Sequence, residues 1–129
     1  MNTLIPLCIL ILKNSLVFKP FDMKLNCSAC STIEDFMGIL TNQLNEYYNF
    51  QFQTSPEIKL VTGSKFHKII VNNGVWGFIA RMDGVLKGKP YRRGDLLKAA
   101  SFASPAPISR GNVIEGCSYD VYGPFYLTR

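Results

Sequence analysis

The spacing of hydrophobic residues changes along the chain from a helical period to a strand period. From Thr32 to Tyr48, hydrophobic side chains recur every three or four residues and form one stripe, which consists of Ile33, Phe36, Met37, Leu40, Leu44 and Tyr47. Ser31 and Glu34 fit a capping box before this stripe, and Asp35 adds negative charge to the first turn, where the helix dipole favours it. We therefore predict an amphipathic helix over this segment, with its stripe in the core.

Beyond the helix, the pattern indicates short strands separated by turns. Phe50 and Phe52 alternate with glutamines, and further β-rich runs follow at residues 57–61, 66–71, 75–81 and 85–86. Two segments supply residues that tolerate the positive φ values of tight turns, Asn72-Asn73-Gly74 and Met82-Asp83-Gly84. We expect an antiparallel hairpin or meander, with core candidates that alternate on one strand face at Trp76, Phe78 and Ala80.

The pattern is less regular after this hairpin. Glycines and a proline interrupt residues 87–95, for which we expect an exposed loop or a widened hairpin end. For residues 96–102 we expect a strand that closes the meander. The alternative is a short helix with Asp95 as its N-cap. Residues 104–108 contain two prolines, which lack a backbone N–H, so we expect an extended surface crossing without regular strand pairing. The aromatic tail from Tyr119 should pack back onto the domain.

These elements predict one α+β domain over residues 23–129, with one amphipathic helix packed on a three- to four-stranded antiparallel sheet. A chain of 129 residues has room for one core rather than two. Residues 1–22 are expected to form an apolar N-terminal extension, and Met23 is an alternative functional start. The apolar run Leu4–Leu12 is shorter than the roughly 20 residues of a membrane span. We also expect no secretion signal, because no basic residue precedes this run and no cleavage site follows it.

Charge is divided unevenly between the two halves of the chain. Residues 1–62 hold four Lys and five acidic residues, whereas residues 63–129 hold ten Lys or Arg and four acidic residues, so the second half carries all of the net charge of +5. Such asymmetry is typical of a protein with an anionic partner, most often nucleic acid, although a solvated face has the same composition. The hydrophobic content of 47% excludes an intrinsically disordered chain.

The four cysteines indicate free thiols in a reducing compartment rather than a disulfide scaffold. Cys27 and Cys30 form a CxxC motif directly before the predicted helix, where a thiolate would be stabilised, so structural, redox and metal-binding roles are all open. Cys8, Cys117 and His67 are isolated in the sequence, which leaves a zinc site without its second half. No cofactor or metal is expected. His67, the only histidine, is interpreted as a strand-surface residue because no catalytic partner can be assigned to it.

Basic residues around the second hairpin are the best functional candidates. The predicted nucleic-acid-binding residues are Lys87, Lys89, Arg92, Arg93, Lys98 and Arg110. Arg81 belongs to the same basic cluster, which spans 18 residues from Arg81 to Lys98. Tyr91 lies within it and Trp76 and Phe78 lie near it, so phosphate contacts could combine with base stacking on single strands. A solvated hairpin tip beside a buried Trp76 explains the same pattern.

Three short motifs resemble a small family of uncharacterised tailed-bacteriophage proteins. The motifs are Leu97-Lys98-Ala99-Ala100-Ser101, Ser104-Pro105-Ala106 and Arg110-Gly111-Asn112, within a resemblance that covers residues 65–115. The chain departs from the family pattern at Phe102, where members carry Trp, and at Ala103-Ser104, where they carry Lys. The resemblance implies a viral origin without an established activity. The motif residues Lys98 and Arg110 could converge on one polar site or brace the fold.

Together these features predict a small, non-enzymatic viral accessory protein that binds nucleic acid through a basic hairpin or loop face. Two alternatives stay open. The first is a protein–protein role, as a virion component or an inhibitor of a host factor, in which the basic face docks on an acidic partner. The second is a redox protein built on Cys27 and Cys30. The expected location is the host cytoplasm or the virion.

Overall fold

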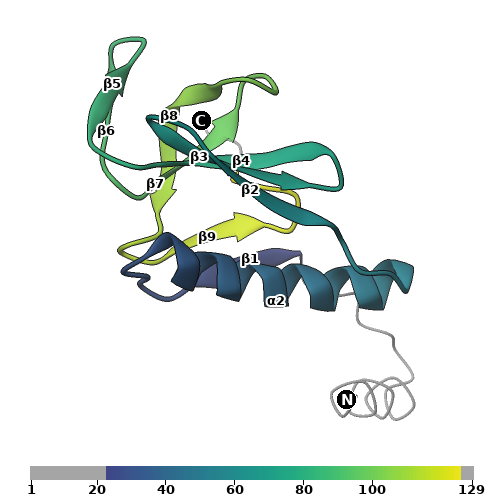
Figure 1. Cartoon of the computed structure of the whole chain (residues 1–129). Helices are drawn as coiled ribbons and strands as arrows, with labels where there is room; N and C mark the ends of the chain where they lie inside the picture. Colours follow the sequence, from purple (N-terminus) through teal and green to yellow (C-terminus); the bar gives the residue numbers. More distant parts are fainter. Residues whose placement is uncertain (1–22, 126–129) are drawn as a thin grey trace.

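One helix lies across a twisted antiparallel sheet in the computed structural model, which describes residues 23–125 (Figure 1). Helix α2 spans Ile33–Phe52. The main sheet has five strands in the order β2-β3-β4-β7-β8. Their bounds are Ile58–Thr62 for β2, Phe66–Val71 for β3, Gly74–Ala80 for β4, Asp95–Ala99 for β7 and Pro105–Asn112 for β8. The expected α+β architecture is confirmed, although this sheet has more strands than the three to four expected.

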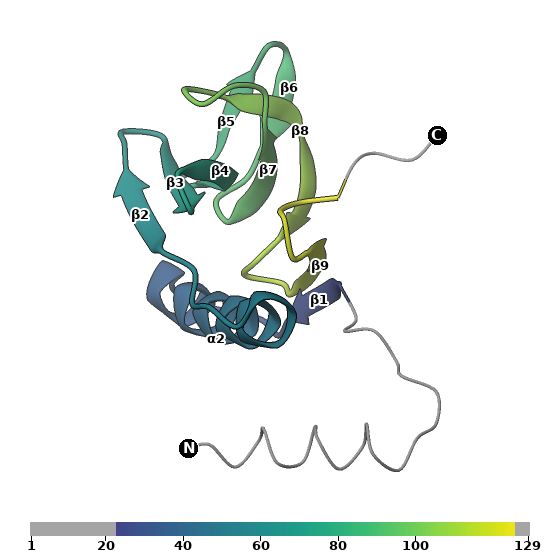
Figure 2. The same cartoon turned by 90° about the vertical axis from the view of Figure 1, so that its right-hand side faces the viewer.

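Two smaller antiparallel pairs complete the fold. Strand β1, Lys24–Cys27, pairs with β9, Cys117–Asp120, and this ribbon lies beside α2 (Figure 2). Strand β5, Gly84–Leu86, pairs with β6, Lys89–Tyr91, in a hairpin that projects away from the helix. No helix among residues 23–125 is long and apolar enough to cross a membrane. The apolar N-terminal extension expected over residues 1–22 lies outside the described residues.

The helix is longer than its hydrophobic stripe predicts. Its N-cap is Thr32 rather than Ser31: the Thr32 hydroxyl accepts a 3.1 Å hydrogen bond from the backbone N–H of Asp35, and the Ser31 hydroxyl donates to the Asp35 carboxylate. At the other end the helix continues to Phe52, where a strand was expected. The Phe52 ring packs at 5.5 Å from the ring of Tyr48, four residues earlier. Side chains at this spacing are neighbours on a helix surface, which explains the extension.

The turns form where their chemistry allows. Asn72 and Asn73 take φ values of 50° and 70° between paired Val71 and Gly74, so the first hairpin is confirmed, with both central positions occupied by Asn. Residues 87–95 do not form a loop throughout. Lys87 and Gly88 make a tight turn with positive φ, and β5 pairs with β6 on either side of it.

The expectation of an unpaired crossing over residues 104–108 is wrong, because strand β8 begins at Pro105. It pairs with β7 in spite of its prolines, although the register shifts twice along the pair. A proline can enter a sheet at an edge, because only one side of the strand then has to donate hydrogen bonds to a neighbour. Strand β8 is an edge strand of the main sheet, as this rule requires.

A β-bulge at Trp76 changes the faces of β4. Ile69 pairs with Gly77 and Ile70 with Val75, which leaves Trp76 as an extra residue on its strand. Trp76 and Ile79 therefore both join the core cluster on the helix side, while the Phe78 ring packs 6.3 Å from the ring of Phe66. The expected alternation of Trp76 and Phe78 on one face is wrong, although both side chains are buried.

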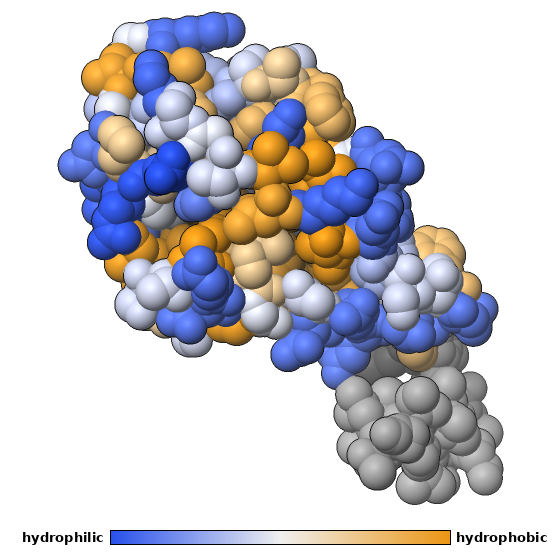
Figure 3. Space-filling view, in the orientation of Figure 1, coloured by the Kyte–Doolittle hydropathy of each residue, from blue (hydrophilic) through white to orange (hydrophobic). Residues whose placement is uncertain are grey.

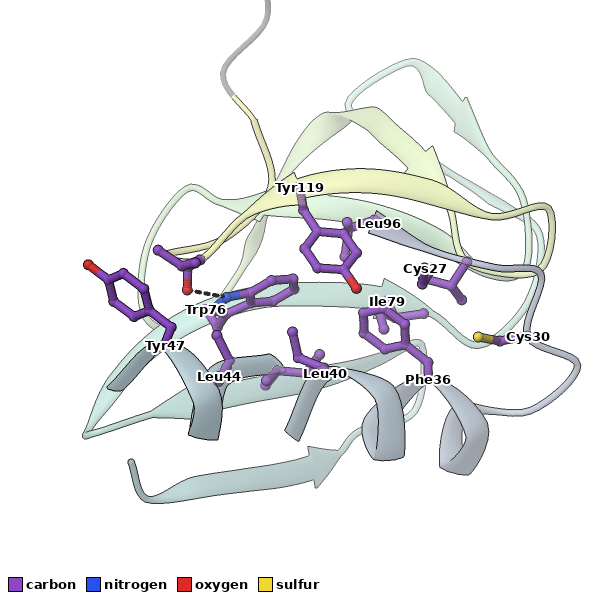
Figure 4. Packing of buried hydrophobic residues seen from close by; sticks show 13 residues of the cluster. Cys27, Cys30, Phe36, Leu40, Leu44, Tyr47, Trp76, Ile79, Leu96 and Tyr119 are labelled. Carbon is purple, nitrogen blue, oxygen red and sulfur yellow. Dashed lines mark hydrogen bonds between the residues drawn. The ribbon is translucent and has the colours of Figure 1, made fainter. Parts of the chain in front are cut away.

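The core lies between α2, β4 and the β1–β9 ribbon (Figure 4). Phe36 contributes an edge-to-face contact with Tyr119 at 5.7 Å, and Trp76 makes another with Tyr119 at 5.3 Å. The Trp76 indole N–H donates to the carbonyl of Val121 at 3.1 Å, which satisfies the one polar group of this ring. The described part of the aromatic tail thus packs onto the domain, as expected.

Candidate functional site

The six basic residues predicted to bind nucleic acid fall into three separate pairs. Lys87 and Lys89 lie at the exposed tip of the β5–β6 hairpin. Arg92 and Arg93 form the exposed turn between β6 and β7. The third pair, Lys98 and Arg110, lies on the neighbouring strands β7 and β8. The structure therefore does not place all six on one hairpin.

Lys98 and Arg110 hold the end of the described chain. The Lys98 ammonium donates to the carbonyl of Pro124 at 3.0 Å, and the Arg110 guanidinium donates to the carbonyl of Phe125 at 2.8 Å. Partial burial lowers the pKa of both side chains, and the neighbouring Arg110 charge lowers that of Lys98 further. Of the two roles considered for the motif residues, this geometry favours bracing of the fold.

Arg92 is paired with acidic neighbours. Its guanidinium donates two hydrogen bonds to the Glu115 carboxylate, at 2.8 and 3.3 Å, and lies 3.9 Å from the carboxylate of Asp95. The Glu115 hydrogen bonds raise the pKa of Arg92 and lower the pKa of Glu115. Its charge is therefore largely neutralised for any external anion.

A buried polar pair fixes the shape of this arginine turn. Asp95 and Asn112 are 3% and 5% exposed, and the Asn112 amide donates to the Asp95 carboxylate at 2.9 Å. The same carboxylate accepts from the backbone N–H of Arg92, while the amide of Asn112 also donates to the carbonyl of Arg93. The amide oxygen of Asn112 accepts from the backbone N–H of Ile114 at 2.9 Å. These bonds tie the arginine turn to the loop that follows β8.

A cleft of about 240 Å³ lies next to this turn, at the start of α2. Three basic side chains from three different segments line it: His67 from β3, Arg81 from the residue after β4, and Arg93 from the turn. Residues 30–33, directly before and at the first turn of the helix, form another wall. The cleft is therefore the place where the described residues gather basic groups around a concave surface.

Both arginines at the cleft keep unpaired donors among the described residues. Arg81 uses Nη1 to donate to the carbonyls of Gly63 and Ser64, which leaves Nε and Nη2 without a hydrogen-bond partner. The Arg93 backbone is anchored because its N–H donates to the Asp83 carboxylate at 2.8 Å, but its guanidinium has no hydrogen bond or ion pair in residues 23–125. Positioned guanidinium groups with open donors are suited to phosphate or carboxylate.

The predicted binding residues include Arg93. Arg81 belongs to the predicted basic cluster but not to that list, and His67 has no predicted binding role. The hairpin register could have indicated the latter two. His67 pairs with Ile79 and Phe66 pairs with Ala80, so His67 and Arg81 must lie near the same end of the β3–β4 hairpin. Arg93 lies near this hairpin end because the N–H of the next residue, Gly94, donates to the carbonyl of Ala80 at 2.9 Å. The hairpin register does not indicate this contact.

His67 has a pKa below its ordinary value of 6.5, first because of burial and then because of the positive charge of Arg81, while Glu34 acts in the opposite direction. Its Nδ1 lies 2.9 Å from the Thr62 hydroxyl. The imidazole is therefore neutral at pH 7, and the permanent positive charge of the cleft comes from its arginines.

This depressed pKa predicts a pH-dependent stability. The folded state binds a proton on His67 only at a pH below the pKa of this residue in the unfolded chain. As the pH falls, the unfolded state therefore holds more protons than the folded state, and acidification favours unfolding. The free energy of unfolding should therefore decrease from pH 7 downward through the folded pKa of His67. Urea titrations between pH 7 and 5.5 on the wild type and on His67→Gln measure this effect, because the chain has one histidine. An identical pH slope in the two proteins would contradict the assignment.

The CxxC motif does not have the features of a reactive dithiol. Burial, together with the neighbouring Cys27, raises the pKa of Cys30, whereas dithiol redox centres depend on a lowered thiol pKa. No group of three or more His, Cys, Asp or Glu side chains in the described part of the chain is arranged to hold a metal ion. Cys117, which looks isolated in the sequence, instead lies opposite Cys27 on the paired strand β9.

Comparisons of the chain with protein-family models, with curated proteins and with solved structures find no significant match. The resemblance to bacteriophage proteins stays a prediction from the three short motifs.

Proposed function

We propose that the protein is a non-enzymatic nucleic-acid-binding protein whose cleft at the start of α2 receives a backbone phosphate. The observation that supports this proposal is the convergence of Arg81 and Arg93, both with open guanidinium donors, on one concave surface. Lys87 and Lys89 extend the basic surface along the β5–β6 hairpin, whose base adjoins the cleft through the hydrogen bond from Arg93 to Asp83. A role as a phage-like accessory protein belongs to the same proposal.

Phosphate fits this cleft better than a base does. The aromatic side chains near the basic cluster, Trp76, Phe78 and Tyr91, are buried and offer no ring face for stacking. The expected combination of phosphate contact with stacking on these rings is therefore revised to phosphate contact alone. Contacts to phosphate position a protein on nucleic acid without reading its sequence, so we expect binding with little sequence preference. A cleft of about 240 Å³ is also smaller than the roughly 300–1,000 Å³ of most small-molecule sites.

The test is the salt dependence of binding by the double variant Arg81→Ala/Arg93→Ala. We expect its affinity for a labelled single-stranded oligonucleotide to fall about tenfold or more at low salt. The slope of log affinity against log salt should decrease by about 1 to 2, because each phosphate contact contributes roughly 0.7 to 0.9. Fluorescence anisotropy titrations across salt concentrations, with DNA and RNA in single- and double-stranded form, measure both quantities.

A matched control separates the cleft from net charge. Lys59→Ala removes one positive charge from strand β2, where Lys59 is exposed beside Glu57, and Arg93→Ala removes one positive charge from the cleft. Arg93→Ala should weaken binding and reduce the slope, whereas Lys59→Ala should change both only slightly. Equal effects of the two variants would show that binding follows overall charge, and an unchanged slope in the double variant would contradict the proposed site.

A protein-binding role is the second candidate, supported by a different surface. Hydrophobic side chains gather over the middle of the face seen in Figure 3, with hydrophilic residues around them. Strand β2 is an edge strand of the main sheet, and its side chains Leu60 and Val61 are 38% and 47% exposed. An apolar sheet edge can accept a strand from another protein. A host complex that survives nuclease treatment, and that is lost on Val61→Lys, would favour this candidate.

A further inference from the structure

Three cysteine thiols meet where the β1–β9 ribbon approaches the start of α2. Cys27 is the last residue of β1 and Cys117 is the first residue of β9, and the two are directly opposed in the strand register. Their sulfur atoms lie 4.0 Å apart, although the residues are separated by 90 positions. Cys30 lies at the same end of the core, next to Phe36 and Cys27 (Figure 4), and its thiol donates to the carbonyl of Ser28 at 3.2 Å.

The register of the two strands places Cys27 and Cys117 directly opposite each other, at a hydrogen-bonded pair. The N–H of Val121 donates to the carbonyl of Met23 at 2.9 Å, which makes this pair hydrogen-bonded. Hydrogen-bonded pairs alternate along an antiparallel ladder, so the pair formed by Cys27 and Cys117, four residues further along each strand, has the same type. The Cα atoms of such pairs are about 5.5 Å apart, which is within the usual range for a disulfide, whereas their Cβ atoms have to come closer to reach its range of about 3.5–4.5 Å.

A glycine packs against Cys117, so no side chain from strand β8 crowds this thiol at that point. Gly111 lies against Cys117, and a Cβ atom on Gly111 would come within 2.8 Å of the Cβ of Cys117. The sulfur atoms, 4.0 Å apart, reach a bond length of about 2.05 Å when both side chains rotate and the two strands approach each other slightly. Cys30 shares the site: its thiol donates to the carbonyl of Ser28 and also interacts with Cys27.

We propose that Cys27 and Cys117 form a reversible intramolecular disulfide when the protein meets a low-molecular-weight disulfide such as oxidised glutathione. This pair joins Cys27 of the CxxC motif to a cysteine outside it, neither Cys27 nor Cys117 lines the basic cleft, and the proposal does not depend on the proposed function.

Exposure determines the order of the two exchange steps. Cys117 is the partly exposed residue of the three, whereas Cys27 and Cys30 are buried. The Cys117 thiolate attacks one sulfur of oxidised glutathione and releases one glutathione thiolate. The Cys27 thiolate then attacks the Cys117 sulfur of the mixed disulfide and releases the second. Two protein thiols are oxidised, one glutathione disulfide is reduced, and the two protons lost by the cysteines are taken up by the two glutathione thiolates.

Cys117 is nevertheless buried enough to make the reaction slow at neutral pH. Burial and the neighbouring Cys27 raise the pKa of Cys117 to about 12, so only a small fraction of this thiol is ionised at pH 7. The thiolate is the attacking species, and its concentration rises about tenfold for each pH unit well below the pKa. The rate of closure should therefore rise about tenfold between pH 7.5 and 8.5. This sensitivity distinguishes Cys117 from a dithiol with a low pKa.

The experiment uses the full chain with Cys8→Ser, so that residue 8, which lies outside the described residues, cannot exchange. The protein is incubated with oxidised glutathione at pH 7.5 and 8.5 and then digested, and the peptides are mapped by mass spectrometry. We expect a peptide linked through Cys27 and Cys117, and a rise of about 8 °C or more in the unfolding midpoint, because the bond closes a long loop. A thiol reductant should reverse both changes.

Two variants complete the test. With Cys30→Ala the link between Cys27 and Cys117 should still form, and with Cys117→Ala no internal link should form. A dominant link between Cys27 and Cys30, a disulfide between two chains, or a glutathione adduct on Cys117 that never closes would overturn the proposal. The absence of reaction after prolonged incubation at pH 8.5 would do the same.

Discussion

Replacing Asn112 by alanine is expected to lower the free energy of unfolding by about 3 kcal/mol. The amide of Asn112 donates to the buried Asp95 carboxylate and to the carbonyl of Arg93, and its oxygen accepts from the backbone N–H of Ile114. Alanine removes all of these bonds and leaves a buried carboxylate with one donor fewer. The loss should therefore exceed that of an ordinary hydrogen bond, which is worth about 1 kcal/mol.

Urea denaturation followed by tryptophan fluorescence measures this effect, because the chain has one Trp, and it lies in the core. Asn42→Ala on the exposed side of α2 is the matched control and should change stability by less than about 0.5 kcal/mol. Since Asn112 also holds the turn that carries Arg93, binding of nucleic acid to the folded variant should weaken as well. A stability loss below about 1 kcal/mol would show that the buried pair is not important for the fold.

Phe36→Ala is expected to lower the free energy of unfolding by about 4 kcal/mol. The Phe36 side chain is 0% exposed, and its ring lies 5.7 Å from the ring of Tyr119 and 6.3 Å from that of Trp76. Removing the Phe36 ring leaves a cavity between α2 and the rings of Trp76 and Tyr119. These rigid rings can only partly collapse into the space.

Thermal and urea unfolding of Phe36→Ala, Phe36→Leu and Phe102→Ala test this prediction. Phe36→Leu keeps most of the volume and should retain much of the stability. Phe102 is 58% exposed, so its removal should have little effect on the unfolding midpoint. Similar losses for Phe36→Ala and Phe102→Ala would contradict the placement of Phe36 at the centre of the core.

The helix and the first hairpin were predictable because their signals are local. A stripe with a period of three to four residues requires only the segment itself, and Asn72-Asn73 encodes its own turn through residues that tolerate positive φ. The end of the helix was not predictable in this way. Phe50 and Phe52 fit the period of a strand, and the contact between the rings of Tyr48 and Phe52 that favours helix becomes visible only once the helix exists.

Features that depend on distant residues could not be predicted from the pattern. The bulge at Trp76 places Ile79, rather than Phe78, on the same sheet face as Trp76. A strict alternation of side chains therefore assigned Phe78 to the wrong face. The charge cluster indicated Arg93, but its meeting with Arg81 at one cleft depends on how Gly94 bonds to the end of β4. The approach of Cys117 to Cys27 depends on two strands that are far apart in the sequence. Spacing in the sequence carries no information about such pairings.

The pairing of β1 with β9 also sets the order in which this protein can fold. Strand β1 precedes every other described element and must wait for a partner that is synthesised 90 residues later. Until then Tyr119 and Val121 are missing from the core, and the stripe of α2 has no cover on that side. Contacts between residues so far apart slow folding, because the chain must close a long loop before they stabilise it. A partly synthesised chain therefore exposes a hydrophobic helix face, and we expect it to aggregate more readily than the complete chain.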